Sequence, residues 1–182
     1  QQVVSKDIWL FGYGSLMWKT GFDFEESRLA LLEDHARRFW QGSEDHRGVP
    51  GAPGRVVTLV HAPGERCWGM AYRLHADQLD EILVSLDFRE KGGYERELIT
   101  MAFRTGEEVK GLTYFATSAN PHYLGYSPDN EIARQIAGSH GPSGSNKEYI
   151  LQLHHTLTDH AVQDEHVSTL AKLVQQLTEQ QV

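Results

Sequence analysis

The spacing of hydrophobic and polar positions changes about two-thirds of the way along the chain. Short apolar runs bounded by turn residues predict strands at 8–12, 56–61, 67–73, 94–104 and 109–117. Apolar positions at helical spacing predict helices at 76–86, 129–139, 147–159 and 164–178. Strands therefore dominate the first part and helices the last third. This segregation predicts an α+β fold, with a small closed or nearly closed sheet covered by helices.

The remaining segments give a mixed or non-regular pattern. Residues 25–40 are rich in Glu, Arg, Leu and Ala, which favour a helix, but Arg38-Phe39-Trp40-Gln41 suits a strand. Residues 42–55 contain several glycines and two prolines and are expected to form a long loop. We expect two hairpins, one joining 56–61 to 67–73 through 62–65, the other turning at Thr105-Gly106.

Composition limits the classes of function. A chain of 182 residues predicts a single domain over 1–182, with residues 1–7 disordered or a cloning remnant. The net charge of −8 argues against nucleic acid or an anionic membrane as a partner, and no obligate protein partner is indicated. An anionic substrate would need a local basic pocket, for which the candidates are Arg37, Arg38, Arg47, Arg55, Arg89 and Lys91.

The single cysteine, Cys67, excludes an internal disulfide and a Cys-rich zinc site. It lies in an apolar run, which predicts a buried, inert thiol rather than a nucleophile. The sequence shows no signal peptide and no apolar run long enough to span a membrane. These features predict a cytoplasmic protein.

The most informative segment is Phe11-Gly12-Tyr13-Gly14-Ser15-Leu16, which follows an apolar strand. Its backbone N–H groups carry little side-chain bulk and could hold a carboxylate or a developing oxyanion. A dinucleotide fingerprint would need its third glycine at Met17, so that interpretation fails. The alternative is a β-turn in which the glycines only supply positive φ angles.

A second informative segment places Glu90 beside Gly92-Gly93, after a predicted helix. Apolar neighbours such as Phe88 and Tyr94 are expected to raise the pKa of Glu90 above its usual range, as a general base requires. Local sequence does not exclude the neighbouring carboxylates Glu81, Asp87, Glu95 and Glu97.

The sequence gives weaker support for a metal site or a serine nucleophile. The ten histidines include no H-E-x-x-H and no pair four residues apart, so we expect no metal site, with His154, His155, His160 and His166 on exposed helix faces. His35, His46 and His61 lie apart in the sequence, with no carboxylate-bearing motif around them. Ser15 lacks the G-x-S-x-G context of a nucleophile.

The four tryptophans are assigned to the core, with Trp18 as a candidate pocket wall. They are Trp9, Trp18, Trp40 and Trp68.

The turn at 141–146 predicts a helix N-cap at Ser145 or Asn146. Tyr149 lies one turn into that helix. Its side chain is expected either to pack in the core or to point its hydroxyl into a cavity.

Taken together, four segments resemble the ChaC family of glutathione-specific γ-glutamylcyclotransferases. They are the 12–16 loop, residues 38–51, residues 86–94 and the Gly141-Pro142-Ser143-Gly144 turn. The resemblance implies a small mixed β-barrel flanked by helices, with no metal and no cofactor. It implies that Glu90 is the catalytic base and that substrate is bound by Gly12, Tyr13, Gly14, Ser15, Leu16, Met17 and Tyr149.

The resemblance also implies a reaction, the cleavage of glutathione to 5-oxoproline and cysteinylglycine. The α-amine of the glutamyl group attacks the γ-amide carbonyl of the same molecule, so the protein needs no nucleophile of its own. Two alternatives stay open. One is a cyclotransferase for other γ-glutamyl amines or dipeptides, and the other is a non-catalytic module that binds small anions.

Overall fold

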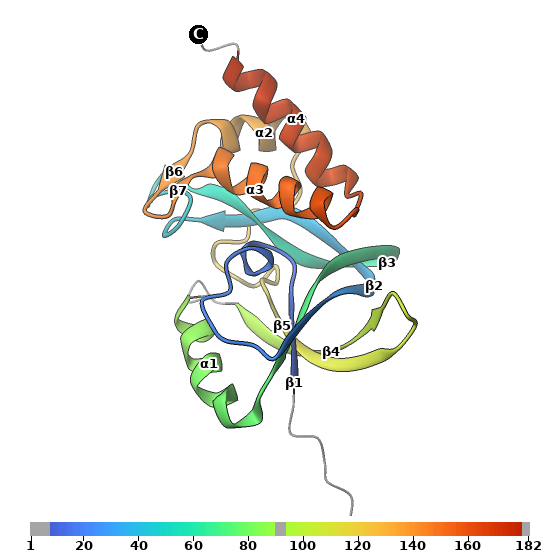
Figure 1. Ribbon diagram of the computed structural model, residues 1–182. Helices are drawn as coiled ribbons and strands as arrows, with labels where there is room; N and C mark the ends of the chain where they lie inside the picture. Colours follow the sequence, from blue (N-terminus) through green and yellow to red (C-terminus); the bar gives the residue numbers. More distant parts are fainter. Residues whose placement is uncertain (1–7, 90–93, 180–182) are drawn as a thin grey trace, which may run out of the picture. The chain divides into compact units, whose positions relative to one another are not determined.

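The computed structural model describes residues 8–89 and 94–179, except for the side chains of residues 87–89 (Figure 1). Contacts between residues divide the chain into two compact units, which are described separately. The first unit comprises Gln1–Ala36 and His61–Thr117, and the second comprises Arg37–Val60 and Ser118–Val182.

Five strands form a closed barrel in the order β1-β3-β2-β4-β5. They are β1 (Ile8–Gly12), β2 (Glu26–Ser43), β3 (Gly54–Leu74), β4 (Glu95–Phe103) and β5 (Glu108–Phe115). β1 pairs antiparallel with β3, so that Phe11 lies opposite Ala71, and parallel with β5, so that Leu10 lies opposite Leu112. The barrel is therefore mixed, and the predicted α+β class is confirmed.

The contested segment 25–40 is a strand. In β2, Ala30, Leu31 and Leu32 are buried in succession, a pattern that one face of a surface helix does not produce. Ala30 pairs with Phe103 of β4, so the segment obtains its hydrogen bonds from a neighbouring strand. Sheet pairing thus overrides the local helix propensity. The predicted loop follows, between the end of β2 at Ser43 and the start of β3 at Gly54.

The predicted hairpin at 56–73 is wrong, because β3 is one strand from Gly54 to Leu74. Its second half pairs with β1, in the register Met70 opposite Gly12, instead of turning back on its first half. Gly64 has a φ of 85°, so the glycine that suggested a turn only bends the strand.

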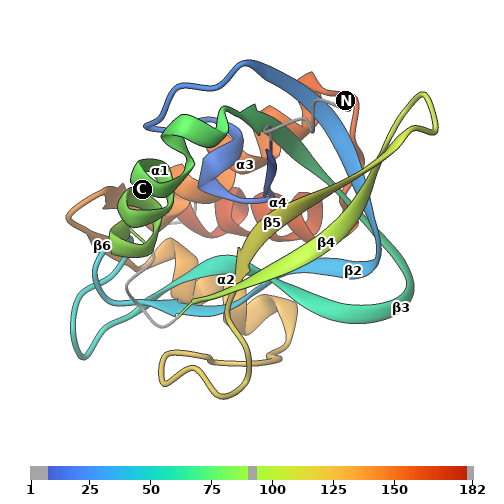
Figure 2. The same ribbon diagram turned by 90° about the horizontal axis from the view of Figure 1, so that it is seen from below.

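The other predicted hairpin is confirmed. β4 and β5 pair antiparallel from Glu95 opposite Phe115 to Ala102 opposite Glu108, and Gly106 takes a φ of 91° in the connection. Figure 2 shows the two strands side by side with a strong twist. The helix α1 (Ala76–Arg89) precedes this hairpin and buries Ile82 and Leu86.

The second unit contains the helices α2 (Asp129–Ala137), α3 (Asn146–Asp159) and α4 (Glu165–Glu179), as the spacing predicted. α4 packs against both α2 and α3. A short pair of strands, β6 (His140–Gly141) and β7 (Gly144–Ser145), leads into α3. Ser145 is the N-cap, since its side chain accepts a hydrogen bond from the backbone N–H of Glu148.

The tryptophans differ from the prediction, because all four are only partly buried. Trp9 packs edge-on against Phe103 with ring centroids 5.1 Å apart, and the guanidinium of Arg104 lies 5.7 Å from the ring centroid of Trp68. Their large rings therefore lie at the border of the core and are not enclosed by it. None of the helices in the described ranges has the length and apolar character needed to cross a membrane.

Candidate active site

The 12–17 loop begins where β1 ends and is held by close backbone packing. A Cβ added to Gly12 would lie 2.7 Å from the Cβ of Leu16, and one added to Gly69 would lie 2.4 Å from the carbonyl oxygen of Gly12. Neither Gly12 nor Gly14 has a positive φ. The glycines at 12 and 69 are therefore required for close approach of backbone segments, and the interpretation of Gly12 and Gly14 as positive-φ turn residues is wrong.

The loop continues as a short 3₁₀ turn, Ser15–Met17. The N–H of Met17 donates to the carbonyl of Gly14 at 2.9 Å, and the N–H of Lys19 donates to the carbonyl of Ser15 at 2.8 Å. Gly12, Tyr13, Gly14, Leu16 and Met17 are buried, whereas Ser15 is partly exposed. The loop predicted from sequence is thus a compact, largely buried backbone turn.

Two tyrosine hydroxyls tie this loop to the barrel. Tyr72 of β3 donates to the carbonyl oxygen of Leu16 at 2.6 Å, and Tyr13 donates to the carbonyl oxygen of Tyr114 at 2.5 Å. Burial raises the pKa of Tyr72 to about 12, because the phenolate form would lose its hydration. The Tyr72 hydroxyl therefore stays protonated, and remains a donor, at neutral pH.

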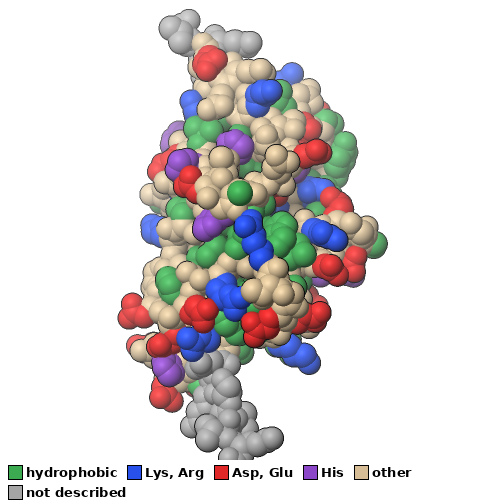
Figure 3. Space-filling model, turned by 45° about the vertical axis from the view of Figure 1, so that its right-hand side comes forward, with side chains coloured by type: hydrophobic (Ala, Val, Ile, Leu, Met, Phe, Trp, Pro, Cys, Tyr) green, Lys and Arg blue, Asp and Glu red, His purple; other side chains and the backbone are tan. Residues whose placement is uncertain are grey.

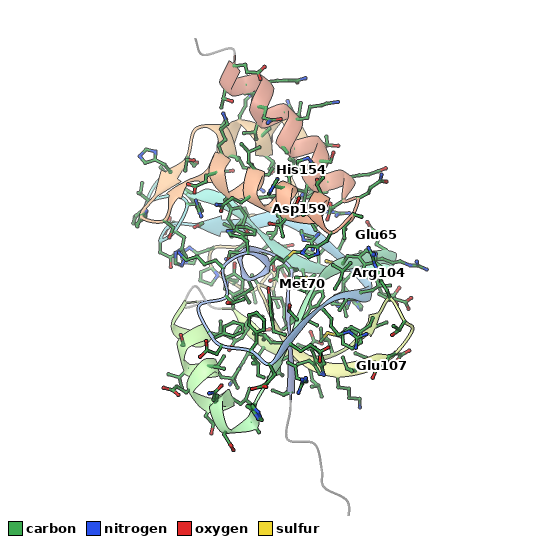
Figure 4. The ribbon with its side chains drawn as sticks, viewed as in Figure 1. Glu65, Met70, Arg104, Glu107, His154 and Asp159 are labelled. Atoms are coloured by element: carbon green, nitrogen blue, oxygen red, sulfur yellow. The ribbon has the colours of Figure 1, made fainter. Side chains whose placement is uncertain are left out.

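A further tyrosine contact links β5 to α1. The hydroxyl of Tyr114 donates to the carbonyl oxygen of Leu83, in the middle of α1, at 3.5 Å. Tyr13 and Tyr114 thus connect the loop, β5 and α1 within one unit. Met70, labelled in Figure 4, lies on β3 directly opposite Gly12.

Glu90 itself lies outside the residues that the structure describes, so its role and its raised pKa stay predictions. The side chain of Asp87 is also outside them. Of the rival carboxylates, Glu81 on α1 and Glu95 and Glu97 on β4 are exposed.

Tyr149 belongs to the second unit and is 5% exposed. Its hydroxyl oxygen accepts a hydrogen bond from the backbone N–H of Val57 at 3.3 Å, and its ring meets Phe39 edge-on with centroids 5.9 Å apart. The packing role is therefore confirmed, and contact with a substrate stays a prediction.

Several of the arginines considered for a basic pocket have protein partners. Arg37, 1% exposed, forms an ion pair with Asp164 at 2.7 Å. The buried guanidinium of Arg55 donates to the carbonyl of Phe39 and to side chains of Gln135 and Ser127. Burial lowers the pKa of Arg55, and the negative charge of Glu131 offsets this effect in part. Sequence reasoning missed this structural role, because the partners of Arg55 are distant in the sequence.

The sequence predicts Asn146 only as a possible N-cap of α3. Its side-chain amide instead pairs with the backbone of Arg55, accepting from the N–H at 2.7 Å and donating to the carbonyl at 2.8 Å. This buried amide therefore satisfies both backbone polar groups of Arg55.

The histidines and the cysteine only partly follow the predictions. Cys67 is buried as expected. His166 is not on an exposed face, since its Nε2 accepts a hydrogen bond from the N–H of Phe39 at 3.0 Å. The rings of His35 and His61, which are distant in the sequence, lie 5.0 Å from each other between centroids. Within the described part of the chain, no group of three or more His, Cys, Asp or Glu side chains could hold a metal ion.

Acidic and basic side chains are intermixed over the face shown in Figure 3. No broad basic patch stands out among the described residues of that face.

Comparison with known proteins decides the family. The model of the ChaC-like protein family matches residues 8–177. The chain belongs to the ChaC-like family.

Curated relatives of this ChaC-like chain cover most of its length. It is 40% identical over 173 residues to human glutathione-specific gamma-glutamylcyclotransferase 1, covering 92% of this chain and 78% of the human protein. It is 39% identical over 178 residues to gamma-glutamylcyclotransferase 2-3 of Arabidopsis thaliana, covering 93% of this chain and 89% of that protein.

A solved structure supports the same relationship. The crystal structure of the yeast gamma-glutamylcyclotransferase specific to glutathione superposes on this ChaC-like chain with a TM-score of 0.88 at 28% identity. The match covers 94% of this chain and 96% of the yeast chain. The barrel-and-helix architecture predicted for the family is therefore confirmed.

Proposed function

We propose that this chain is a glutathione-specific γ-glutamylcyclotransferase. The observation that carries the proposal is its similarity, over nearly its whole length, to relatives from human and yeast that bear this name. The loop geometry supports it, because the 12–17 segment is a compact backbone turn that the barrel holds in place.

The reaction needs little covalent chemistry from the protein. The glutamyl α-amine of glutathione attacks the γ-carbonyl carbon, and the bond from that carbon to the cysteinyl nitrogen breaks. Ring closure yields 5-oxoproline, and the released amine is cysteinylglycine. Holding the amine near ~3 Å from the carbonyl carbon contributes several kcal/mol through orientation alone.

Glu90 is the proposed proton carrier. As a general base it takes a proton from the attacking ammonium group, and it then returns a proton to the departing cysteinyl nitrogen. A second proton leaves the attacking nitrogen as it becomes the lactam N–H, and the same carboxylate passes it to the released amine, which departs as an ammonium ion. One carboxylate therefore suffices, and the net reaction consumes no acid or base.

The loop is proposed to bind the anionic part of the substrate. Backbone N–H groups of Tyr13, Gly14, Ser15 and Leu16 are the candidate donors to the α-carboxylate or to the oxyanion that forms at the γ-carbonyl. Tyr72 and Tyr13 hold this backbone through their hydroxyls, so its donors need no reorganisation when charge develops. Gly12 and Met17 are the first and last residues of the loop. Tyr149 is also proposed to contribute to substrate binding.

The domain organisation, the partners and the cellular compartment are also proposals. The continuous family match over residues 8–177 supports a single domain over 1–182. Glutathione is the proposed partner, with no nucleic acid, membrane or obligate protein partner. The single buried thiol of Cys67 supports the cytoplasm as the compartment.

Incubation of the purified chain with glutathione, followed by detection of 5-oxoproline and cysteinylglycine, tests the proposal. We expect turnover of glutathione in preference to γ-glutamyl-alanine and γ-glutamyl-lysine, and no change in rate after treatment with EDTA. Preference for either γ-glutamyl-alanine or γ-glutamyl-lysine would indicate the broader cyclotransferase. A thermal shift with glutathione but no product would indicate a binding module and would overturn the proposal.

A further inference from the structure

His35 and His61 come from different strands of the first unit, and their rings approach each other. His35 lies on β2 and His61 on β3. The ring centroids are 5.0 Å apart and the planes are inclined by 41°. His61 is exposed and His35 is partly exposed, so an ion from solvent can reach the pair.

The hydrogen bonds of the two rings determine which nitrogen is available. Nδ1 of His35 lies 2.8 Å from the carbonyl oxygen of Glu33, and Nδ1 of His61 lies 3.1 Å from the carbonyl oxygen of Asp34. A carbonyl oxygen only accepts, so each Nδ1 carries the hydrogen and donates it. In the neutral imidazole this leaves the lone pair on Nε2 of both rings. Histidines that ligate metals characteristically make this Nδ1–H contact to a carbonyl or carboxylate.

The separation of the rings suits a shared ion. With metal–nitrogen bonds of about 2.0–2.1 Å, each ring centre lies about 3.2 Å from the metal, so two ligands at the tetrahedral angle place their ring centres about 5 Å apart. The observed 5.0 Å agrees with that spacing.

The backbone around the pair is held by contacts between β2 and β3. Asp34 takes a φ of 59°, and its Oδ1 accepts a hydrogen bond from the N–H of Gly64 at 2.8 Å. The bond from His61 to the carbonyl of Asp34 is a second link between the strands. These contacts hold the carbonyl that orients His61, which lowers the cost of arranging the ligands before an ion binds.

We propose that His35 and His61 form a surface site for a divalent transition metal ion of the zinc class. The two Nε2 atoms ligate the ion, and water molecules complete its coordination. Imidazole nitrogen suits zinc, copper and nickel, whereas magnesium and calcium prefer oxygen ligands. The site clamps β2 to β3 and takes no part in the proposed cyclotransferase reaction, on which the inference does not depend.

Isothermal titration with zinc sulfate tests the site on four proteins, namely the unmodified chain, His35→Gln, His61→Gln and the double variant. Because one ion bound by two ligands loses chelation when either is removed, we expect each single variant to bind zinc at least about tenfold more weakly. The double variant should bind zinc only slightly more weakly than the single variants. Magnesium should not bind measurably.

The matched control replaces His154 and His155 on α3 with glutamine, because His155, whose Nε2 lies 3.2 Å from Oδ2 of Asp159, is the alternative place where zinc could bind. His154 and Asp159 are labelled in Figure 4. The α3 control should bind zinc with the affinity of the unmodified chain. Zinc should raise the melting temperature of the α3 control and of the unmodified chain, but not that of His35→Gln. Unchanged zinc affinity in His35→Gln or His61→Gln, or loss of binding in the α3 control, would overturn the proposal.

Discussion

The hydroxyl of Tyr72 and the backbone carbonyl of Leu16 are joined by a 2.6 Å hydrogen bond between β3 and the loop after β1. The ring of Tyr72 also packs against Phe22 and Phe24. A buried side chain therefore determines where the backbone of the proposed substrate loop lies, although Tyr72 is far from that loop in the sequence.

Replacing Tyr72 with phenylalanine keeps the ring packing and removes the donor. The carbonyl of Leu16 would lose this donor, which we expect to cost about 1–3 kcal/mol of unfolding free energy. Urea denaturation measures this loss. A displaced loop should also raise the KM for glutathione. Tyr126→Phe is the matched control, because Tyr126 is 75% exposed, and it should leave both quantities unchanged. Equal behaviour of the two variants would remove Tyr72 from the positioning of the loop.

Replacing Glu90 with glutamine tests the proposed base. The amide is nearly isosteric but cannot accept a proton, so kcat should fall by roughly 10²–10⁴ with little change in stability. Steady-state kinetics with glutathione and a thermal melt measure the two effects. Glu95→Gln and Glu97→Gln change exposed carboxylates of β4 and should retain activity. A fully active Glu90→Gln enzyme would contradict the assignment.

Replacing Gly69 with alanine tests the close packing beneath the loop. The new methyl group would lie 2.4 Å from the carbonyl oxygen of Gly12 and 2.7 Å from the ring of Phe11, so β1 or β3 must shift. We expect a destabilisation of about 1–3 kcal/mol in chemical denaturation, with a loss of turnover. At Gly138 the nearest heavy atom to an added Cβ is 3.5 Å away, and Gly138→Ala is expected to be tolerated. Similar stability of the two variants would show that the barrel accommodates the methyl group.

His166 predicts a specific loss of stability in acid. Burial, together with the positive charge of Arg38, lowers its pKa to about 4. A histidine whose pKa is lower in the folded state stabilises the fold fully above its unfolded value of about 6.5. That contribution is lost as the pH falls from about 6.5 to about 4, and it amounts to roughly 2–3 kcal/mol.

The measurement is the unfolding free energy at about pH 7 and about pH 4, compared between the unmodified chain and His166→Gln. Carboxylates titrate in both proteins and largely cancel in the difference. The unmodified chain should lose more stability on acidification, and His155→Gln, which removes an exposed imidazole on α3, should follow the unmodified chain. Parallel pH profiles for the unmodified chain and His166→Gln would contradict the lowered pKa.

Local pattern was sufficient for the elements that make their own hydrogen bonds or pair with their immediate neighbour in the sequence. The helices α1 to α4 follow from helical spacing, and the β4–β5 hairpin follows from Thr105-Gly106. The sequence narrowed the N-cap of α3 to Ser145 or Asn146, and the structure shows that it is Ser145. The 12–17 loop was also recognisable, because a strand that ends in Gly12-Tyr13-Gly14-Ser15 is distinctive in itself.

Elements that depend on distant partners were not predictable in this way. β2 is a strand because β4 pairs with it at Ala30, and β3 continues through Gly64 because its second half pairs with β1. Arg55 and Asn146, and likewise His35 and His61, meet only after strands and helices have been brought together.

The amino-acid sequence by itself determined the α+β class, most element positions and the family, since these are carried by local spacing and by motifs in order along the chain. Only the tertiary structure decided how the loop is held, which polar side chains are buried and which histidines meet. The physical reason is that a hydrogen bond or a ring contact depends on separation in space, and local sequence pattern constrains that separation only between near neighbours.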